Sequence, residues 1–364
     1  MNLPVVDKAN LSGKKVFVRG DIDVPLESLS DQSKSKIVDD TRLKDIWPTL
    51  KYLLDKDSKL ILGGHLGKPG GKEDPKLSSR PVAEWFQSKI VGAGLVPAQN
   101  DAIGATTRVA PTEEINIGSF KGFRVTDDFF VLENLRFDPR EEANDEGLAK
   151  ELASLAEVFV NESFAEAHKT VASTVGVPKL LPHYAGFRLA KELKVLSGIL
   201  DNPERPLVCV IGGAKLETKI PVIAKMAQVA DVVIVGGKLL CEIKSDSEIA
   251  KNPKVKLLEL TKDTKDCTLP SVDQQLDILR QAATIVWNGP LGMVEDYPYQ
   301  VGTRRLAEII AGTSSYKVVG GGDTIGFLDK LGLTEKFDWA CSGGGAMLEF
   351  LAGKGLPGVE ALLV

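Results

Sequence analysis

The feature that most constrains the fold is a repeated pattern in which a short apolar run is followed by a longer amphipathic stretch. This alternation runs along the whole chain and is typical of βα units built on parallel sheets. The runs expected to form strands are 15–18, 59–62, 130–132 and 158–160 in the first half, and 207–211, 232–235, 284–287, 316–319 and 337–340 in the second.

The length of the chain favours two domains, because 364 residues exceed what one hydrophobic core usually supports. Between the halves, residues 186–200 carry leucines at helical spacing, and an Asp-Asn-Pro sequence at 201–203 ends the stretch. We therefore predict an α/β protein of two lobes, each a mostly parallel, Rossmann-like sheet flanked by helices. The N-terminal lobe is expected at 1–185, a hinge helix at 186–200 and the C-terminal lobe at 201–350.

Composition narrows the class of protein. The formal charge is −5, and acidic and basic residues are interspersed, which argues against a general nucleic-acid binder. The N-terminus has no apolar leader segment, and no run reaches the length of a membrane helix. The four cysteines include no closely spaced pair, which favours buried free thiols in a reducing compartment. A soluble, cytoplasmic protein is expected.

Glycines follow every predicted strand of the second half. They occur at 212–213, 236–237, 289 and 292, 320–322 and 343–345. In open parallel sheets ligands bind at the carboxyl ends of the strands, where glycine offers bare N–H groups to anions. One such turn means little, but five on one edge predict a nucleotide-phosphate crevice.

Three charged residues sharpen this prediction. Lys215 and Lys219 lie near the start of the helix expected after 207–211, with Thr218 as its cap and Pro221 in its first turn. Cations oppose the helix dipole there, and a bound phosphate would offset that; alternatively, both lysines are solvated. Asp323 is expected either to bind Mg²⁺ or to cap the next helix. The usual nucleotide signatures are absent, since GxxxxGK[ST] does not occur and the one GxGxxG, at 353–358, leaves no room for a βαβ unit.

The strand ends of the first half carry charged and polar side chains instead. If these converge on one edge, they form a site for a phosphorylated or carboxylated metabolite; each alone would be a surface charge. No nucleophile system and no zinc spacing are recognised, so direct phosphoryl transfer is favoured. The residues concerned are Arg19, Asp21, Asp23, Arg42, His65, Lys68, Asn134, Arg136, His168 and Lys169.

The strand ends of both halves lie in longer segments: VRGDIDVP at 18–25, DTRLKDIWPTL at 40–50, HLGKP at 65–69, LENLRF at 132–137, VNESFAEAHK at 160–169, GGAKLETKI at 212–220, WNGPLG at 287–292, GGGDT at 320–324 and SGGGA at 342–346. Together these segments resemble the phosphoglycerate kinase family, and the resemblance covers nearly the whole chain. The resemblance implies reversible phosphoryl transfer between 1,3-bisphosphoglycerate and ADP, with Mg²⁺, after closure of the hinge. It also implies that 351–364 packs back onto the first lobe. A monomer is expected, because two lobes that close on each other supply the interface that catalysis needs.

The resemblance assigns roles residue by residue. It implies that Arg42, Lys215, Gly322 and Gly345 are catalytic, and that Asp323 holds the magnesium ion. Phosphoglycerate is expected at Arg19, Asp21, Asp23, Arg42, His65, Lys68, Arg136 and Lys169. The nucleotide is expected at Gly213, Ala214, Lys215, Lys219, Gly236, Gly237, Asn288, Pro290, Glu295, Gly321, Gly322, Asp323 and Thr324.

Departures from the family pattern concentrate on the acid's side. Asp23 stands where the family has Asn, and Lys68 and Lys169 stand where it has Arg. Ile22, Gly64 and Val171 also differ, and the stretch 238–277 is shorter than usual. Lysine lacks the bidentate fork of arginine, so we expect weaker phosphoglycerate binding, by about 1 kcal/mol for each lost fork. A diverged kinase of another small phosphorylated carboxylate, or a catalytically weak nucleotide-binding relic, are the alternatives.

Overall fold

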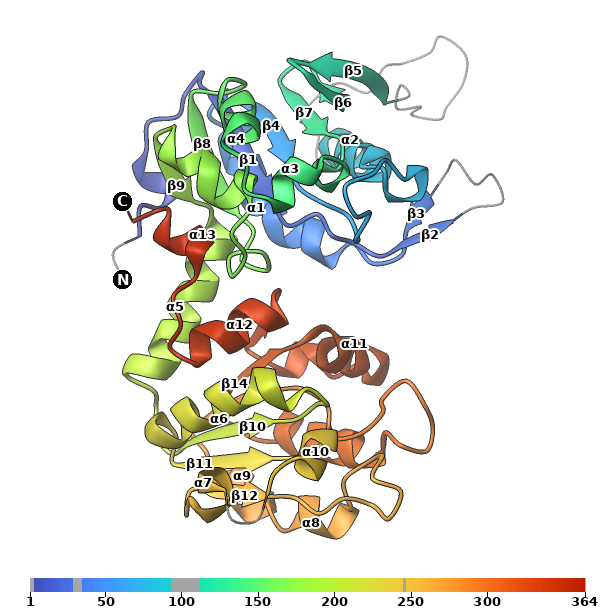
Figure 1. Cartoon of the computed structure of the whole chain (residues 1–364), viewed down its shortest axis with the longest axis vertical. Helices are drawn as coiled ribbons and strands as arrows, with labels where there is room; N and C mark the ends of the chain where they lie inside the picture. Colours follow the sequence, from blue (N-terminus) through green and yellow to red (C-terminus); the bar gives the residue numbers. More distant parts are fainter. Residues whose placement is uncertain (1–2, 29–34, 93–111, 245–246, 364) are drawn as a thin grey trace. The chain divides into compact units, whose positions relative to one another are not determined.

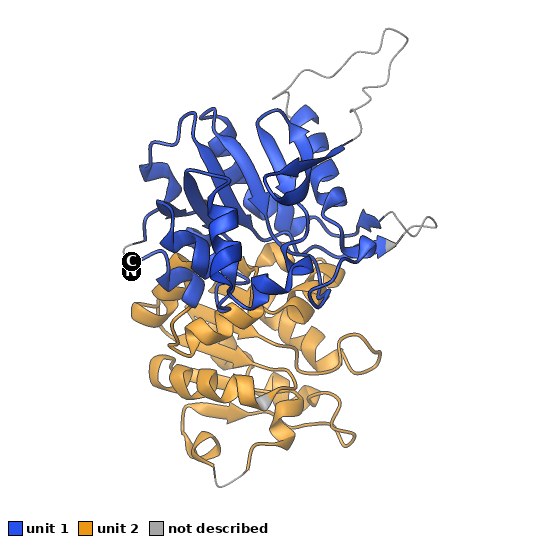
Figure 2. Ribbon diagram, turned by 45° about the horizontal axis from the view of Figure 1, so that its top comes forward, with its two compact units in different colours: residues 1–191, 357–364 blue, residues 192–356 orange. Residues whose placement is uncertain are grey.

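The computed structural model describes residues 3–28, 35–92, 112–244 and 247–363 (Figure 1). Its chain divides into two units, which Figure 2 colours separately. Unit 1 comprises Met1–Lys191 and Pro357–Val364, and unit 2 comprises Glu192–Leu356. The division falls inside helix α5 (Phe187–Asp201), and the chain returns to unit 1 only at Pro357.

Unit 1 is built on a seven-stranded sheet of order β5-β6-β7-β4-β1-β8-β9. Its parallel strands are β1 (Lys15–Gly20), β4 (Lys59–Gly63), β7 (Phe129–Leu132), β8 (Val158–Glu162) and β9 (His183–Ala185). At one edge β5 (Glu113–Ile117) and β6 (Phe120–Thr126) run antiparallel. A separate hairpin joins β2 (Leu26–Ser28) and β3 (Ser35–Ile37). The helices are α1 (Thr41–Leu54), α2 (Arg80–Gly92), α3 (Pro139–Glu142), α4 (Glu146–Ala153) and α13 (Pro357–Glu360).

Unit 2 is an all-parallel six-stranded sheet of order β12-β11-β10-β13-β14-β15. The strands are β10 (Leu207–Ile211), β11 (Val232–Val235), β12 (Val255–Leu257), β13 (Thr284–Asn288), β14 (Tyr316–Gly320) and β15 (Trp339–Cys341). The helices are α6 (Leu216–Val229), α7 (Glu248–Lys251), α8 (Leu269–Asp273), α9 (Leu276–Gln281), α10 (Val301–Ala311), α11 (Gly322–Leu331) and α12 (Gly344–Leu351).

The register of this sheet positions the glycine turns. Ile211 pairs with Val235 on one side and with Asn288 on the other, and Asn288 pairs with Gly320. The strands therefore end in line, and the loops that follow them emerge at one edge. Both faces are apolar, with Trp287 fully buried beneath this edge, as expected for a parallel sheet covered on both sides.

The predicted fold class, two lobes with mostly parallel sheets flanked by helices, is confirmed. The last strand is shifted from 337–340 to Trp339–Cys341, because Phe337 packs into the core from the loop after a 3-10 turn. The β5–β6 hairpin was not predicted, since β5 is mostly exposed and carries no apolar run. Among the described residues, no helix combines the length and hydrophobicity needed to cross a bilayer.

Two local predictions are wrong. Helix α6 begins before Thr218, whose hydroxyl donates to the carbonyl of Lys215 at 3.0 Å instead of capping the helix, and Pro221 lies in the second turn. The free thiols of Cys209, Cys267 and Cys341 are buried as predicted, but Cys241 is exposed because it ends a 3-10 turn on the surface.

Candidate active site

A pocket of about 350 Å³ opens at the carboxyl ends of the strands of unit 2. It brings together residues from three strand-end turns and from the start of α11, as the parallel register requires. Of the residues predicted to bind nucleotide, it is lined by Gly213, Ala214, Gly237, Pro290, Glu295 and Asp323; the other lining residues are Lys238, Asp263, Thr264, Lys265, Gly292 and Met293.

The turns around this pocket hold one another through backbone hydrogen bonds. The N–H of Gly213 donates to Pro290 at 2.8 Å, and its carbonyl accepts from Leu239 at 3.1 Å. Gly237 has φ +82°, and a Cβ there would lie 2.7 Å from the Gly213 nitrogen. Only glycine fits this crossing, so the predicted turns form one interlocked frame.

Two buried side chains stabilise these turns and the end of β13 through hydrogen bonds. Thr324 is fully buried, and its hydroxyl accepts from the N–H of Gly289 at 3.1 Å. Lys219 is also buried and donates to Asn288. Burial lowers the pKa of the Lys219 ammonium to about 8. The alternative that both lysines are solvated is therefore wrong for Lys219, whereas Lys215 is exposed as the residue before α6.

Two helices begin beside the glycine turns. Gly322 is the first residue of α11, and Gly345 is the second of α12, so both lie in a first turn whose N–H groups lack intrahelical acceptors. Asp323 is exposed at the second position of α11 and makes no capping bond. Within the described residues no group of three His, Cys, Asp or Glu side chains could hold a metal. One exposed carboxylate in the first turn of a helix fits Mg²⁺ bound together with phosphate groups, because this ion typically keeps several waters and phosphate ligands.

A tight turn, residues 260–267, closes one wall of the pocket and was missed from the sequence. Leu260 and Cys267 pair as an antiparallel bridge, and Thr264 at the tip has φ +60°. The buried carboxylate of Asp266 accepts from Cys267 at 2.8 Å and from Gly302, at the start of α10, at 2.9 Å. Burial raises the pKa of Asp266. The shortened stretch 238–277 thus still supplies a wall.

In unit 1 most of the predicted substrate residues follow the ends of β1, β4, β7 and β8. Arg19 is buried, and its guanidinium donates to Ser173 at 2.9 Å and to the carbonyl of Gly20. A third nitrogen lies 3.2 Å from Nδ1 of His65. Asn134 donates to two backbone carbonyls and so shapes the loop that carries Arg136. Neighbouring strand ends therefore bring these side chains together.

Carboxylates sit among these cations. Glu166, which sequence reasoning did not single out, accepts from Arg136 at 2.7 Å and from Lys169 at 3.0 Å. Its Oε1 lies 3.7 Å from Nε2 of His65, and Asp23 Oδ2 lies 3.6 Å from the same nitrogen. Burial alone would raise the pKa of both carboxyls, but His65 and the neighbouring cations hold both below their usual range.

Arg42, the second residue of α1, is another of the predicted substrate residues. It donates to Asp21 at 2.7 Å, and the charge of Asp21 raises the pKa of the guanidinium. The second oxygen of Asp21 is buried and has no hydrogen-bond partner among the described residues. Such an oxygen can accept a hydroxyl of a bound ligand. Lys68 is exposed.

The comparisons with known proteins agree along the whole chain. A family model described as phosphoglycerate kinase matches residues 6–248 and 241–354. The phosphoglycerate kinase of Chloroflexus aggregans is 38% identical, covering all of this chain and 99% of that protein. That of Leptospira biflexa is 35% identical with the same coverage.

This chain belongs to the phosphoglycerate kinase family. It is accordingly a phosphotransferase that uses ATP or ADP and phosphoglycerate as small-molecule substrates. Among solved structures, phosphoglycerate kinase from Coxiella burnetii matches with a TM-score of 0.77 at 31% identity, over all of this chain and 99% of that one. The enzyme from Pyrococcus horikoshii matches with a TM-score of 0.77 at 25% identity, over 99% and 98%.

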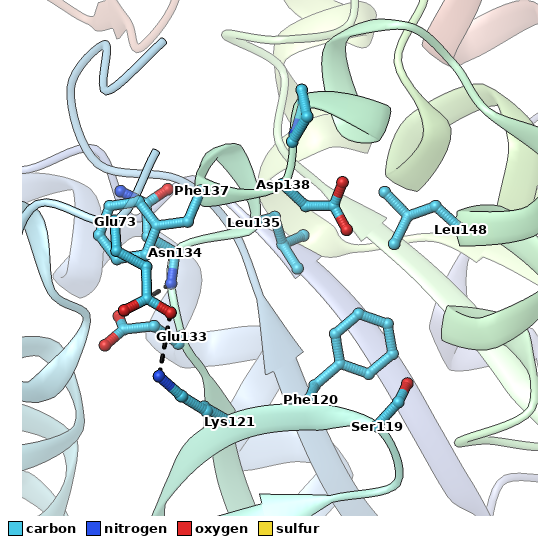
Figure 3. Close-up of a pocket in the computed structure, with 11 residues that line it drawn as sticks. Glu73, Ser119, Phe120, Lys121, Glu133, Asn134, Leu135, Phe137, Asp138 and Leu148 are labelled. Atoms are coloured by element: carbon cyan, nitrogen blue, oxygen red, sulfur yellow. Dashed lines mark hydrogen bonds and ion pairs between the residues drawn. The ribbon is translucent and has the colours of Figure 1, made fainter. Parts of the chain in front are cut away.

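A second pocket, of about 410 Å³, lies in unit 1, and its lining includes Asn134, Leu135 and Phe137 from the segment that carries Arg136 (Figure 3). Phe120, Leu135 and Leu148 supply its apolar surface. Its charged groups are engaged already: Lys121 pairs with Glu73 at 2.9 Å, and Glu133 accepts from backbone N–H groups. We assign this pocket no part in phosphoryl transfer.

Proposed function

We propose that this chain catalyses reversible, magnesium-dependent transfer of a phosphoryl group between 1,3-bisphosphoglycerate with ADP and 3-phosphoglycerate with ATP, as a step of glycolysis. The observation that carries the proposal is the presence, in one chain, of a glycine-framed pocket in unit 2 and a basic cluster in unit 1. These suit the two kinds of substrate that such a transfer requires.

In unit 2, the frame of Gly213, Gly237 and Pro290 would hold the nucleotide, and Glu295 would receive its ribose. Lys215 would stabilise the oxygens of the group in transfer, helped by first-turn N–H groups at Gly322 and Gly345. Asp323 would hold Mg²⁺ with the phosphates; a bound magnesium ion neutralises phosphate charge.

In unit 1, the acceptor acid would lie among Arg19, His65 and Arg136, with Asp21 accepting its hydroxyl. Arg42 would contact the group in transfer, and its ion pair with Asp21 would hold the guanidinium in position. No covalent nucleophile is required, because positioning and charge stabilisation suffice for direct in-line transfer. We propose that closure about α5 brings the two substrates together and excludes water, and that the chain works as a cytoplasmic monomer.

The test is an assay of ATP consumption with 3-phosphoglycerate and Mg²⁺, coupled to reduction of the bisphosphoglycerate formed. Saturable turnover that requires both substrates is expected. If ADP binds but no turnover occurs with 3-phosphoglycerate, the proposal fails in favour of another phosphorylated acid as acceptor; if ADP does not bind either, nucleotide chemistry itself is excluded.

A further inference from the structure

The basic cluster of unit 1 is neutralised from within. Glu166 is nearly buried, with 8% of its side chain exposed, and it contacts Arg136 at 2.7 Å and Lys169 at 3.0 Å. His65 Nε2 lies between Glu166, at 3.7 Å, and Asp23, at 3.6 Å. Three of the groups expected to bind phosphoglycerate, those of Arg136, Lys169 and His65, therefore already face a carboxylate.

The two carboxylates are held in place from several directions. Glu166 is bound by side chains that come from separate segments of the chain, and Asp23 accepts from the N–H of Gly67 at 2.7 Å. Arg136 also donates to the carbonyl of Gly67 at 3.1 Å. Neither carboxylate is a surface charge that solvent simply screens.

Resting on the proposed function, we propose that Glu166 and Asp23 are the specificity-determining residues of the acceptor site, and that they disfavour an acid carrying a distal phosphate. A phosphate entering this cluster meets two fixed negative charges of its own sign and must compete with Glu166 for Arg136 and Lys169. Removing the charge of Glu166 weakens its hold on Arg136 and Lys169, and arginine can then offer its bidentate geometry to phosphate. Removing the charge of Asp23 takes away the negative charge 3.6 Å from His65 Nε2.

The experiment compares wild type with Glu166→Gln and Asp23→Asn, measuring kcat and KM for 3-phosphoglycerate, with KM for ATP as an internal reference. We expect the KM for 3-phosphoglycerate to fall about tenfold for Glu166→Gln and about threefold for the more exposed Asp23, with ATP unaffected. Affinity for D-glycerate, measured by calorimetry, should change little, since it lacks the phosphate. If the two carboxylates had only a structural role, the substitutions would change the affinities for 3-phosphoglycerate and D-glycerate to the same extent.

Glu142→Gln is the matched control. Glu142 also pairs with Arg136, at 3.3 Å, but 54% of its side chain is exposed, so its removal should change KM less than about twofold. Unchanged or raised KM for 3-phosphoglycerate in both Glu166→Gln and Asp23→Asn, with turnover intact, overturns the inference. If Glu166→Gln does not fold, Asp23→Asn decides alone. If the wild type does not turn over either, the proposed function fails, while calorimetry with 3-phosphoglycerate still reports whether the carboxylates weaken its binding.

Discussion

The unit proposed to bind the nucleotide and the unit proposed to bind the acid build their candidate sites by different physical means. In unit 2 the frame is backbone: Gly213, Gly237 and Pro290 fix one another through N–H and carbonyl groups. In unit 1 the site is made of side chains, and Arg42 and Arg136 are held by Asp21 and Glu166. A backbone frame tolerates changes of side chain but not of glycine, whereas an ion-paired cluster changes character with a single carboxylate.

The largest expected effect tests whether one side chain of unit 2 acts on the chemistry. Lys215→Ala should lower kcat on the order of 10³-fold, because a charge that stabilises the transferring group is lost. ADP affinity, measured by calorimetry, should stay within about threefold, since the frame is intact. Lys238→Ala is the matched control, because Lys238 is an exposed lysine that lines the pocket of unit 2, whereas Lys215 directly follows the lining residue Ala214; this variant should keep kcat. Equal losses of kcat in the two variants would contradict the assignment.

The next prediction concerns the buried charge of unit 1. Glu162, the last residue of β8, is buried and accepts from the N–H groups of Arg188 and Leu189, at the start of α5, at 3.0 and 3.2 Å. Burial raises its pKa from 4.5 to about 7. The folded state then holds the proton more tightly than the unfolded state. The contribution of Glu162 to stability is therefore fully present below pH 4.5 and is lost as pH rises through 7, by roughly 3 kcal/mol.

Native-state hydrogen exchange of β8 at several pH values measures this, and Glu162→Gln should flatten the dependence between pH 4.5 and 7. Thr49 donates to the same carboxylate, and Thr49→Val should leave a pH dependence in place. A wild-type profile without slope in that interval would show that Glu162 is charged in the folded protein throughout.

A smaller effect tests the backbone frame of unit 2. Gly237→Ala should weaken ADP binding by about 2 kcal/mol, since it adds a Cβ at positive φ against the Gly213 nitrogen. Gly326→Ala, inside α11 with nothing within 4 Å of its Cβ position, is the control. It should leave ADP affinity unchanged and raise the unfolding free energy by up to about 1 kcal/mol. Comparable ADP affinity in both variants would mean that the backbone at Gly213 and Gly237 can shift to accommodate the added Cβ.

The smallest effect probes the wall at 260–267. Asp266→Asn replaces one acceptor oxygen by a donor that faces Cys267 or Gly302, and should weaken ADP binding by about 1 kcal/mol, roughly fivefold. The KM for phosphoglycerate should not change. Asp273→Asn, an exposed residue paired with Arg305, should leave both constants as they are. If Asp266→Asn lowers thermal stability but leaves ADP affinity unchanged, Asp266 has only a structural role.

Much of the fold was determined by local sequence. Period and length mark the buried parallel strands, so 207–211 and 232–235 were predicted with the observed bounds. The β5–β6 hairpin could not be predicted, since exposed strands form through pairing with a neighbour and not through their own hydrophobicity. The start of α6 was predicted too late in the sequence, because the helix follows Lys215 without the side-chain cap that usually marks a helix start.

The sequence by itself determined two α/β lobes, a glycine edge, and a set of cations on the other sheet. Only the tertiary structure decided which of these are engaged: Glu166 neutralises Arg136 from 30 residues away, and Asp266 ties the pocket wall to Gly302 from 36. The physical reason is that hydrophobic period and turn chemistry act between near neighbours along the chain. Charge pairing and burial depend instead on distances in space, which no spacing in the sequence records.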